Sequence, residues 1–254
     1  MVSRVGRWVA VWCCMCSCSL VLEDRDNCPC ELEVSVEGVN GETEVVVDGS
    51  VCARVWGDST VVCRVPRGEL AVMAVSGVSA EEFSGYREAG GFRIPEGLDS
   101  PPLYLGYAVV DAKGESARTR LRVSKEYCAL TLELEGPPGW AEPYSIDITS
   151  DVCGTASNGC PLQGSFSHRL TLSEDGRARV LLPRQLPGGR LEMEILMQDR
   201  LLRTFSLASC MQKAGYDWSA PDLEDIQLEL RFSVTAFTVH VGLWSQTFPL
   251  DVEI

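Results

Sequence analysis

The stretch Leu191-Glu192-Met193-Glu194-Ile195-Leu196-Met197 places an apolar side chain at every second position, with glutamates between the first three of them. Successive side chains of a β-strand point to opposite faces of its sheet, so a period of two predicts a strand with one buried and one solvated face. Shorter runs of the same kind, each bounded by Gly, Asp, Asn or Pro, recur from Cys30 onward. Many short strands separated by turn residues predict an all-β chain.

The alternating runs fall into two groups, with a break near residues 124–126. The first group lies at residues 32–36, 45–55, 70–74, 103–110 and 118–123, and the second at 130–134, 146–148, 170–182, 191–197 and 226–241. Because an all-β sandwich of about 100 residues is ordinary, we predict an N-terminal β-sandwich over 30–125 and a C-terminal β-sandwich over 126–254. A short helix is predicted at 207–214, within the second sandwich.

The composition describes a core-forming protein with an acidic surface. Hydrophobic residues make up 45% of the 254 positions, and the formal net charge is −14. A chain without a basic surface cannot displace counterions from phosphates, so the charge argues against a nucleic-acid partner.

No pattern in the chain indicates an enzyme, a cofactor or a metal site. The two histidines, His168 and His240, lie beside or within alternating runs, and there is no Gly-x-Ser-x-Gly motif. The acidic clusters at 24–26 and 222–225 lack the spacing of a calcium-binding EF-hand loop. We therefore predict a protein that is not an enzyme, needs no cofactor and has no small-molecule ligand.

Residues 1–17 have the features of a lipoprotein signal peptide. Arg4 and Arg7 give a positive start, and the apolar run at 8–15 is too short to span a bilayer as a helix. Ser17 is the small residue that precedes a lipid-modified cysteine, so Cys18 is the predicted lipidation site, followed by a tether over 18–29. The alternatives are a cleaved secretory signal without lipid and, less favoured by its spacing, a metal-binding cysteine cluster.

Eight of the twelve cysteines lie beyond the N-terminal cluster, and their local pattern suggests two disulfides. Cys52 and Cys63 flank the turn at Gly57-Asp58 and could face each other across a hairpin. Cys153 and Cys160 flank a loop of small residues. The alternative is that several of these cysteines are small buried hydrophobic side chains.

The last alternating run has two interpretations. Phe248, Leu250, Val252 and Ile254 alternate with Pro249 and two acidic residues. The run is either the last strand of the second sandwich or a donor strand that completes the sheet of a neighbouring subunit. Pro249 lacks an N–H group and must therefore lie at an edge or outside the ladder.

Two segments resemble the FimB-type fimbrial anchor family of Bacteroidota, the minor fimbrium anchoring subunits. They are Cys18-Ser19-Leu20-Val21-Leu22-Glu23-Asp24-Arg25-Asp26-Asn27-Cys28-Pro29 and the C-terminal set Gly215-Tyr216-Asp217-Trp218, Asp222-Leu223-Glu224-Asp225-Ile226 and Val241-Gly242-Leu243-Trp244. The segments at 66–72 and 149–166 are similar to a strand and a loop of that family. Five cysteines depart from the family pattern, namely Cys52, Cys63, Cys153, Cys160 and Cys210.

The resemblance implies two tandem transthyretin-like β-sandwich domains behind a palmitate-bearing lipid anchor in the cell outer membrane. It further implies a surface-exposed protein that joins a fimbrial shaft subunit by strand donation. Our hypothesis is therefore an outer-membrane lipoprotein that anchors or terminates a fimbrium, or pilus, in cell adhesion. The alternative is a surface lipoprotein that binds a glycan or a host protein through loop aromatics, namely Trp140, Tyr144, Tyr216 and Trp218.

Overall fold

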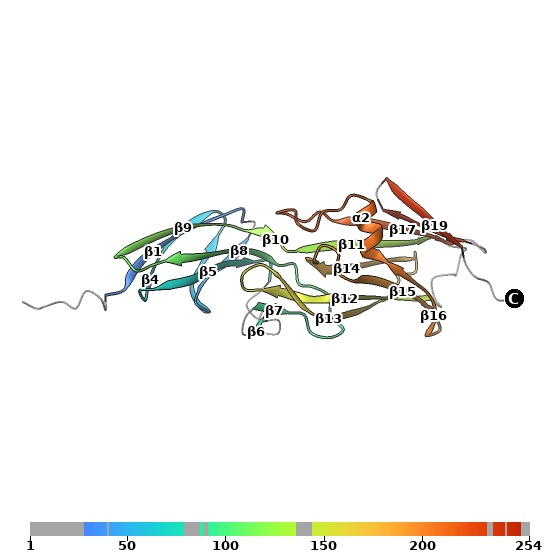
Figure 1. Ribbon diagram of the computed structural model, residues 1–254, viewed down its shortest axis with the longest axis horizontal. Helices are drawn as coiled ribbons and strands as arrows, with labels where there is room; N and C mark the ends of the chain where they lie inside the picture. The colour runs from blue at the N-terminus through green and yellow to red at the C-terminus, as the bar shows by residue number, and fades with distance from the viewer. Residues whose placement is uncertain are drawn as a thin grey trace, which may run out of the picture.

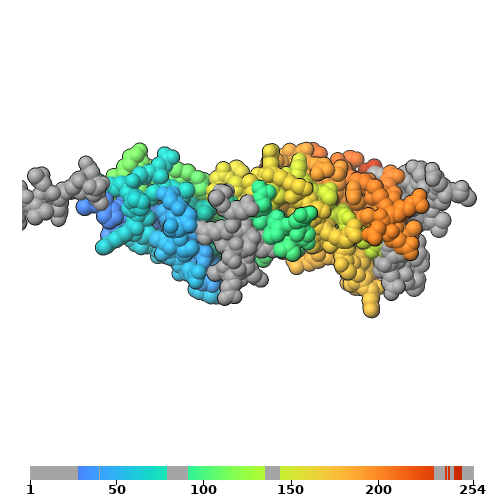
Figure 2. All heavy atoms as spheres, turned by 90° about the horizontal axis from the view of Figure 1, so that it is seen from below, coloured from blue at the N-terminus to red at the C-terminus, as the bar shows by residue number. Residues whose placement is uncertain are grey.

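The alternating segments form strands of two β-sandwiches that lie end to end (Figure 1). The computed structural model describes residues 28–39, 41–78, 87–88, 91–135, 144–232, 236–241 and 243–249. Figure 2 shows the same elongated shape from a second direction. The predicted all-β class with two tandem sandwiches is confirmed.

The first sandwich has two sheets in the described part of the chain. One has the order β4-β1-β9 and the other the order β10-β8-β5-β2-β3. Their bounds are β1 (Cys30–Glu37), β2 (Glu42–Val47), β3 (Ser50–Trp56), β4 (Ser59–Val65), β5 (Glu69–Ser76), β8 (Tyr104–Asp111), β9 (Ser116–Arg122) and β10 (Ser124–Lys125). β1 pairs with β4 antiparallel and with β9 parallel.

The core of the first sandwich follows from the period of two in β1. Leu32, Val34 and Val36 are buried, while the residues between them are more exposed. These side chains meet Leu70 and Val72, which β5 presents from the opposite sheet. Full burial of one such side chain is worth about 1.5–3 kcal/mol, so the apolar face of β1 fixes which side of this strand turns inward.

The second sandwich also has two sheets among the described residues, in the orders β14-β11-β17-β18-β19 and β16-β15-β12-β7-β6, with β13 pairing along β12. Their bounds are β6 (Arg87–Glu88), β7 (Gly91–Arg93), β11 (Tyr127–Glu135), β12 (Tyr144–Ala156), β13 (Pro161–Leu170), β14 (Arg177–Pro183), β15 (Leu191–Met197), β16 (Arg200–Ser206), β17 (Ile226–Phe232), β18 (Ala236–Val241) and β19 (Trp244–Pro249). Here too one parallel pair occurs, between β11 and β17.

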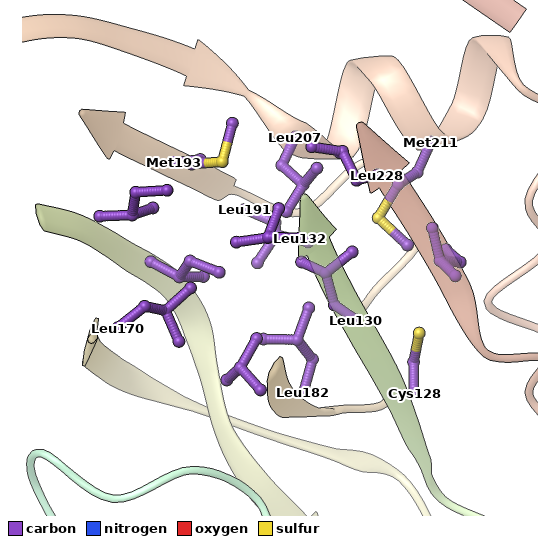
Figure 3. Close-up of a cluster of buried hydrophobic side chains, with 14 of the residues drawn as sticks. Cys128, Leu130, Leu132, Leu170, Leu182, Leu191, Met193, Leu207, Met211 and Leu228 are labelled. Carbon is purple, nitrogen blue, oxygen red and sulfur yellow. The ribbon is translucent and has the colours of Figure 1, made fainter. Parts of the chain in front are cut away.

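Leucines from both sheets meet in the core of the second sandwich (Figure 3). Leu130 and Leu132 come from β11, and Leu191 and Met193 come from β15. The predicted helix is confirmed as α2 (Leu207–Lys213), which adds its buried residues to the same core. The side chain of Ser206 caps the helix by accepting a hydrogen bond from the Ser209 N–H at 3.3 Å.

One segment from the first half of the sequence belongs to the second sandwich. β7 pairs with the end of β12, and the Ile94 N–H donates to the Cys153 carbonyl at 2.8 Å. Ile94 is part of the second core, and the Ser100 N–H donates to the Leu181 carbonyl. Residues 91–100 therefore pack on the second sandwich, although strands on both sides of them in the sequence belong to the first. The hydrophobic pattern did not indicate this exchange.

Candidate functional site

The two ends of the described chain lie at opposite ends of the molecule (Figure 1). Cys28 is exposed and lies two residues before β1. β1 begins at the end of the first sandwich farthest from the second (Figure 1). Cys18, the predicted lipidation site, lies outside the described residues. No helix among the described residues has the length and apolar character that crossing a bilayer requires.

The predicted donor segment begins on the outermost strand of a sheet. Among the described strands, β19 pairs only with β18, and the backbone of Phe248 pairs with that of Phe237. Pro249 ends the strand opposite Ala236 at this edge, where a missing N–H is tolerated. Leu250, Val252 and Ile254 lie outside the described residues, so donation to a neighbour stays a prediction.

The two candidate disulfides have different outcomes. Cys52 and Cys63 are joined by a disulfide bond between β3 and β4. Cys153 and Cys160 are both free thiols, one buried and the other exposed. Cys153 points into the interior, where Arg93 Nη1 lies 3.0 Å from its sulfur, so the two side chains do not meet. Burial raises the pKa of the Cys128 thiol to about 11 and also raises that of Cys210, which suits inert core thiols.

The acidic cluster at 222–225 ties the two sandwiches together. Asp222 accepts hydrogen bonds from Arg122 Nη2 and from the Lys125 N–H, both at 3.2 Å. Asp225 accepts from the Lys125 ammonium and from the Ala129 N–H. Although burial opposes it, these donors hold the pKa of Asp225 below its usual range. The described residues contain no group of three or more His, Cys, Asp or Glu side chains that could hold a metal ion.

Arg184 is the centre of a second set of contacts at this joint. Its Nε lies 2.6 Å from Glu126 Oε2, and both side chains are largely buried. The guanidinium also donates to the carbonyls of Lys125, Trp218, Ala220 and Pro221. Burial raises the pKa of Glu126, while Arg184 opposes that rise. Nothing in the local sequence pattern distinguished Arg184 from an ordinary surface arginine.

The aromatic residues considered as stacking platforms serve other purposes in the structure. Trp218 is buried, and its ring meets that of Tyr216 edge to face at 4.8 Å between centroids. The Tyr216 hydroxyl donates to the Glu224 carbonyl at 2.8 Å, which fixes the loop before β17. Tyr144 packs against the second core, and Trp140 lies outside the described residues. The three described rings are therefore anchors of the fold.

The two histidines lie on different strands of the second sandwich. His168 lies on β13, and its Nδ1 is 2.9 Å from the Gly97 carbonyl oxygen. His240 lines an open groove of about 360 Å³ on the outer face of the sheet that contains β17. The other polar residues of this groove are Thr131, Glu133, Arg177, Gln227 and Glu229. Ser245 pairs with His240 across β18 and β19, and the described residues that line the groove include no serine or cysteine.

Comparison with solved structures identifies the architecture. The fimbrial anchor protein Mfa2 from Porphyromonas gingivalis matches with a TM-score of 0.59 at 13% identity, over 86% of this chain and 99% of its own. This chain has the fold of Mfa2. At this identity the likeness concerns the fold alone, because one fold hosts many functions.

Two further structures share the Mfa2 fold with this chain. A candidate polysaccharide-binding protein from Bacteroides thetaiotaomicron matches with a TM-score of 0.61 at 11% identity, over 86% of this chain and 98% of its own. A candidate adhesin from Bacteroides ovatus matches with a TM-score of 0.57 at 13% identity, over 87% of this chain and 95% of its own. No family model matches the sequence. No curated protein matches it either.

Proposed function

We propose that the protein is a surface-exposed lipoprotein of the outer membrane that anchors or terminates a fimbrium. Cys18 carries the lipid, and the first sandwich stands next to the membrane. The far end of the second sandwich contacts a fimbrial shaft subunit. In this role the protein is structural and not an enzyme.

The observation that carries the proposal is the placement of the two ends of the described chain on a Mfa2-like fold. β1 begins at one end of the long axis, and β19 ends at the other (Figure 1). The contacts of Asp222, Asp225 and Arg184 tie the two sandwiches between these ends. A protein that links a membrane to a filament needs attachment points at opposite ends and a firm connection between them.

Strand donation supplies the joint to the shaft subunit in this proposal. Phe248, Leu250, Val252 and Ile254 occupy every second position of the sequence, and an extended conformation would place the four apolar side chains on one face. Phe248 stays in β19, so burial of the other three side chains in a neighbour's sheet would be worth roughly 4.5–9 kcal/mol before the cost of association. Because β19 ends at Pro249, residues 250–254 can pair with a neighbouring subunit while β19 stays paired with β18.

The test is to change residues 250–254 in the fimbriated cell and to measure where fimbriae are found. Leu250→Asp together with Val252→Asp should release fimbriae into the medium while the protein itself stays on the membrane. The matched control, Asp251→Asn with Glu253→Gln, keeps the apolar face and should retain the fimbriae. Fimbrial retention in the apolar-to-Asp variant would contradict the proposed joint.

The lipid anchor is tested separately by Cys18→Ser. We expect the protein and the attached fimbriae to appear together in the medium, because a non-lipidated mature chain has no anchor. Radiolabelled palmitate should enter the native protein and not the variant. Retention of the Cys18→Ser protein in the outer membrane would show that another segment holds it there.

The likeness to a candidate polysaccharide-binding protein favours a second function, recognition of a glycan. The aromatic rings considered for stacking against a sugar do not support this function, because Tyr144, Tyr216 and Trp218 pack onto the core. A glycan array probed with the purified protein separates the two functions, because the anchor proposal expects no binding.

A further inference from the structure

We propose that the two sandwiches form a mechanical clamp, in which parallel strand pairs resist a pull along the molecule by shear. This inference deepens the proposed function, because the anchor role gives the direction of the pull. The clamp itself is a property of the isolated chain. It rests on strand registers, cross-strand contacts and the contacts at the joint.

The first clamp is the parallel pair of β1 and β9. Its register runs from Glu31 opposite Ser116 to Glu37 opposite Arg122. The chain enters the sandwich at the start of β1, and β9, the last strand of the same sheet, ends at the opposite end of their ladder. Only the two residues of β10, which pair with β8 of the other sheet, follow before the chain passes to the second sandwich. A pull between the start of β1 and the end of β9 acts along the strands and loads all the ladder hydrogen bonds together.

An antiparallel pair of first and last strands would respond differently. Its entry and exit points would lie at the same end of the ladder, so a pull would open the hydrogen bonds one after another. The direction of strand pairing therefore decides between shear and unzipping. Forced unfolding is governed by the unfolding barrier and not by the equilibrium stability, so this difference appears in the rupture force.

Side chains reinforce the β1–β9 pair on both faces. On the outer face, Arg118 Nε lies 3.3 Å from Glu33 Oε2, and Arg120 Nε lies 3.1 Å from Glu37 Oε1. On the inner face, Val34 and Val36 of β1 and Leu121 of β9 are buried in one core. The ion pairs are exposed and contribute little by themselves, so the ladder and the core provide most of the resistance.

The joint passes the pull to a second parallel pair. In the loop before β17, Asp222 accepts a hydrogen bond from the Lys125 N–H at 3.2 Å and Asp225 accepts one from the Ala129 N–H at 2.9 Å. The ion pair of Asp222 with Arg122, the last residue of β9, is exposed and adds little. β17 pairs parallel with β11, from Leu130 opposite Ile226 to Glu135 opposite Arg231. The end of one clamp is thus tied to the start of the next, and both lie along the long axis (Figure 1).

The test is single-molecule force spectroscopy on the full mature chain with the pull applied in two directions. In the first, the handles are at the N-terminus and the C-terminus. In the second, they are at the N-terminus and at Lys113, an exposed residue at the same end of the ladder as the start of β1. The Glu31 N–H donates to the Glu115 carbonyl at 2.9 Å, which places that turn beside the first residues of β1.

We expect the first sandwich to rupture at a several-fold higher force in the end-to-end pull than in the pull through Lys113. The length of chain released identifies the first sandwich in each trace. Both samples have the same fold and differ only in handle position, so a folding defect cannot produce the difference. Equal rupture forces, or a lower force in the end-to-end pull, would overturn the clamp. Fimbrial release is scored in cells, so the anchor proposal and the clamp can fail independently.

Discussion

At the scale of single residues, Cys52 and Cys63 show how one bond joins two sheet edges. Cys52 lies on β3, the edge strand of one sheet, and Cys63 lies on β4, the edge strand of the other. The register of β2 with β3 pairs Val45 with Ala53 and Val46 with Val51, so Cys52 is the extra residue of a β-bulge. Bulges commonly redirect side chains at sheet edges, and here the bulged residue bonds to the facing strand.

We predict that replacing both cysteines, Cys52→Ala with Cys63→Ala, lowers the free energy of unfolding by about 2–3 kcal/mol, as expected for a short closed loop. The two cysteines are separated by 11 positions in the sequence. Urea denaturation with and without a reductant measures the effect. The native protein should lose stability on reduction, and the variant should not respond. Mass mapping that finds both cysteines as free thiols in the native protein would contradict the prediction.

At the scale of elements, β7 joins the second sandwich because two glycines let its backbone approach β12. A Cβ at Gly154 would lie 1.9 Å from the Phe92 carbonyl oxygen, and one at Gly91 would lie 2.4 Å from the Thr155 carbonyl oxygen. No side chain larger than a hydrogen atom fits at either position. The pair β7–β12 therefore depends on glycine for contact as well as for backbone conformation.

Gly154→Ala should separate β7 from β12 and lower the free energy of unfolding by about 2–4 kcal/mol, the sum of backbone strain and overpacking. Gly68→Ala is the matched control, because both glycines have a φ of +154° but a Cβ at Gly68 meets nothing within 4 Å. Gly68→Ala should lower the free energy of unfolding by about 1 kcal/mol. Hydrogen exchange at the Ile94 N–H, which bonds to Cys153 beside the clash, reports the separation directly. Equal losses in the two variants would refute the contact argument.

At the scale of the whole molecule, the joint between the sandwiches combines charge pairing with burial. Arg184 Nε and Glu126 Oε2 lie 2.6 Å apart, with side chains 12% and 8% exposed. Burial raises the pKa of Glu126, and the guanidinium opposes that rise. Removal of Arg184 would leave a buried carboxyl without its cation and four backbone carbonyls without their donor.

Arg184→Met should therefore lower the free energy of unfolding by about 3–5 kcal/mol near neutral pH. Without Arg184 the pKa of Glu126 in the folded state rises further above its unfolded value. The folded variant then binds more protons than the unfolded chain, so its stability falls as pH increases between these two pKa values. Urea denaturation at about pH 5 and about pH 7 should show the larger loss at the higher pH.

The control for Arg184→Met is Arg177→Met, which removes an exposed pair with Glu133. It should cost about 0–1 kcal/mol, since exposed ion pairs are weak. If the cost of Arg184→Met were the same at both pH values, Glu126 would not be the group that responds to the loss of Arg184.

The sequence by itself determined the class of fold and many of the strands with their inward faces, because alternation along a strand is a local property. It also indicated the helix at α2 and the pairing of Cys52 with Cys63, which are separated by only 11 positions. It did not indicate β4, β7 or most of β13. Only the tertiary structure decided that β1 runs parallel to β9, that residues 91–100 pack on the second sandwich, and that Arg184 holds the joint. These features depend on contacts between distant parts of the chain. The local pattern of a strand is the same whichever neighbour it pairs with, so it could not reveal them.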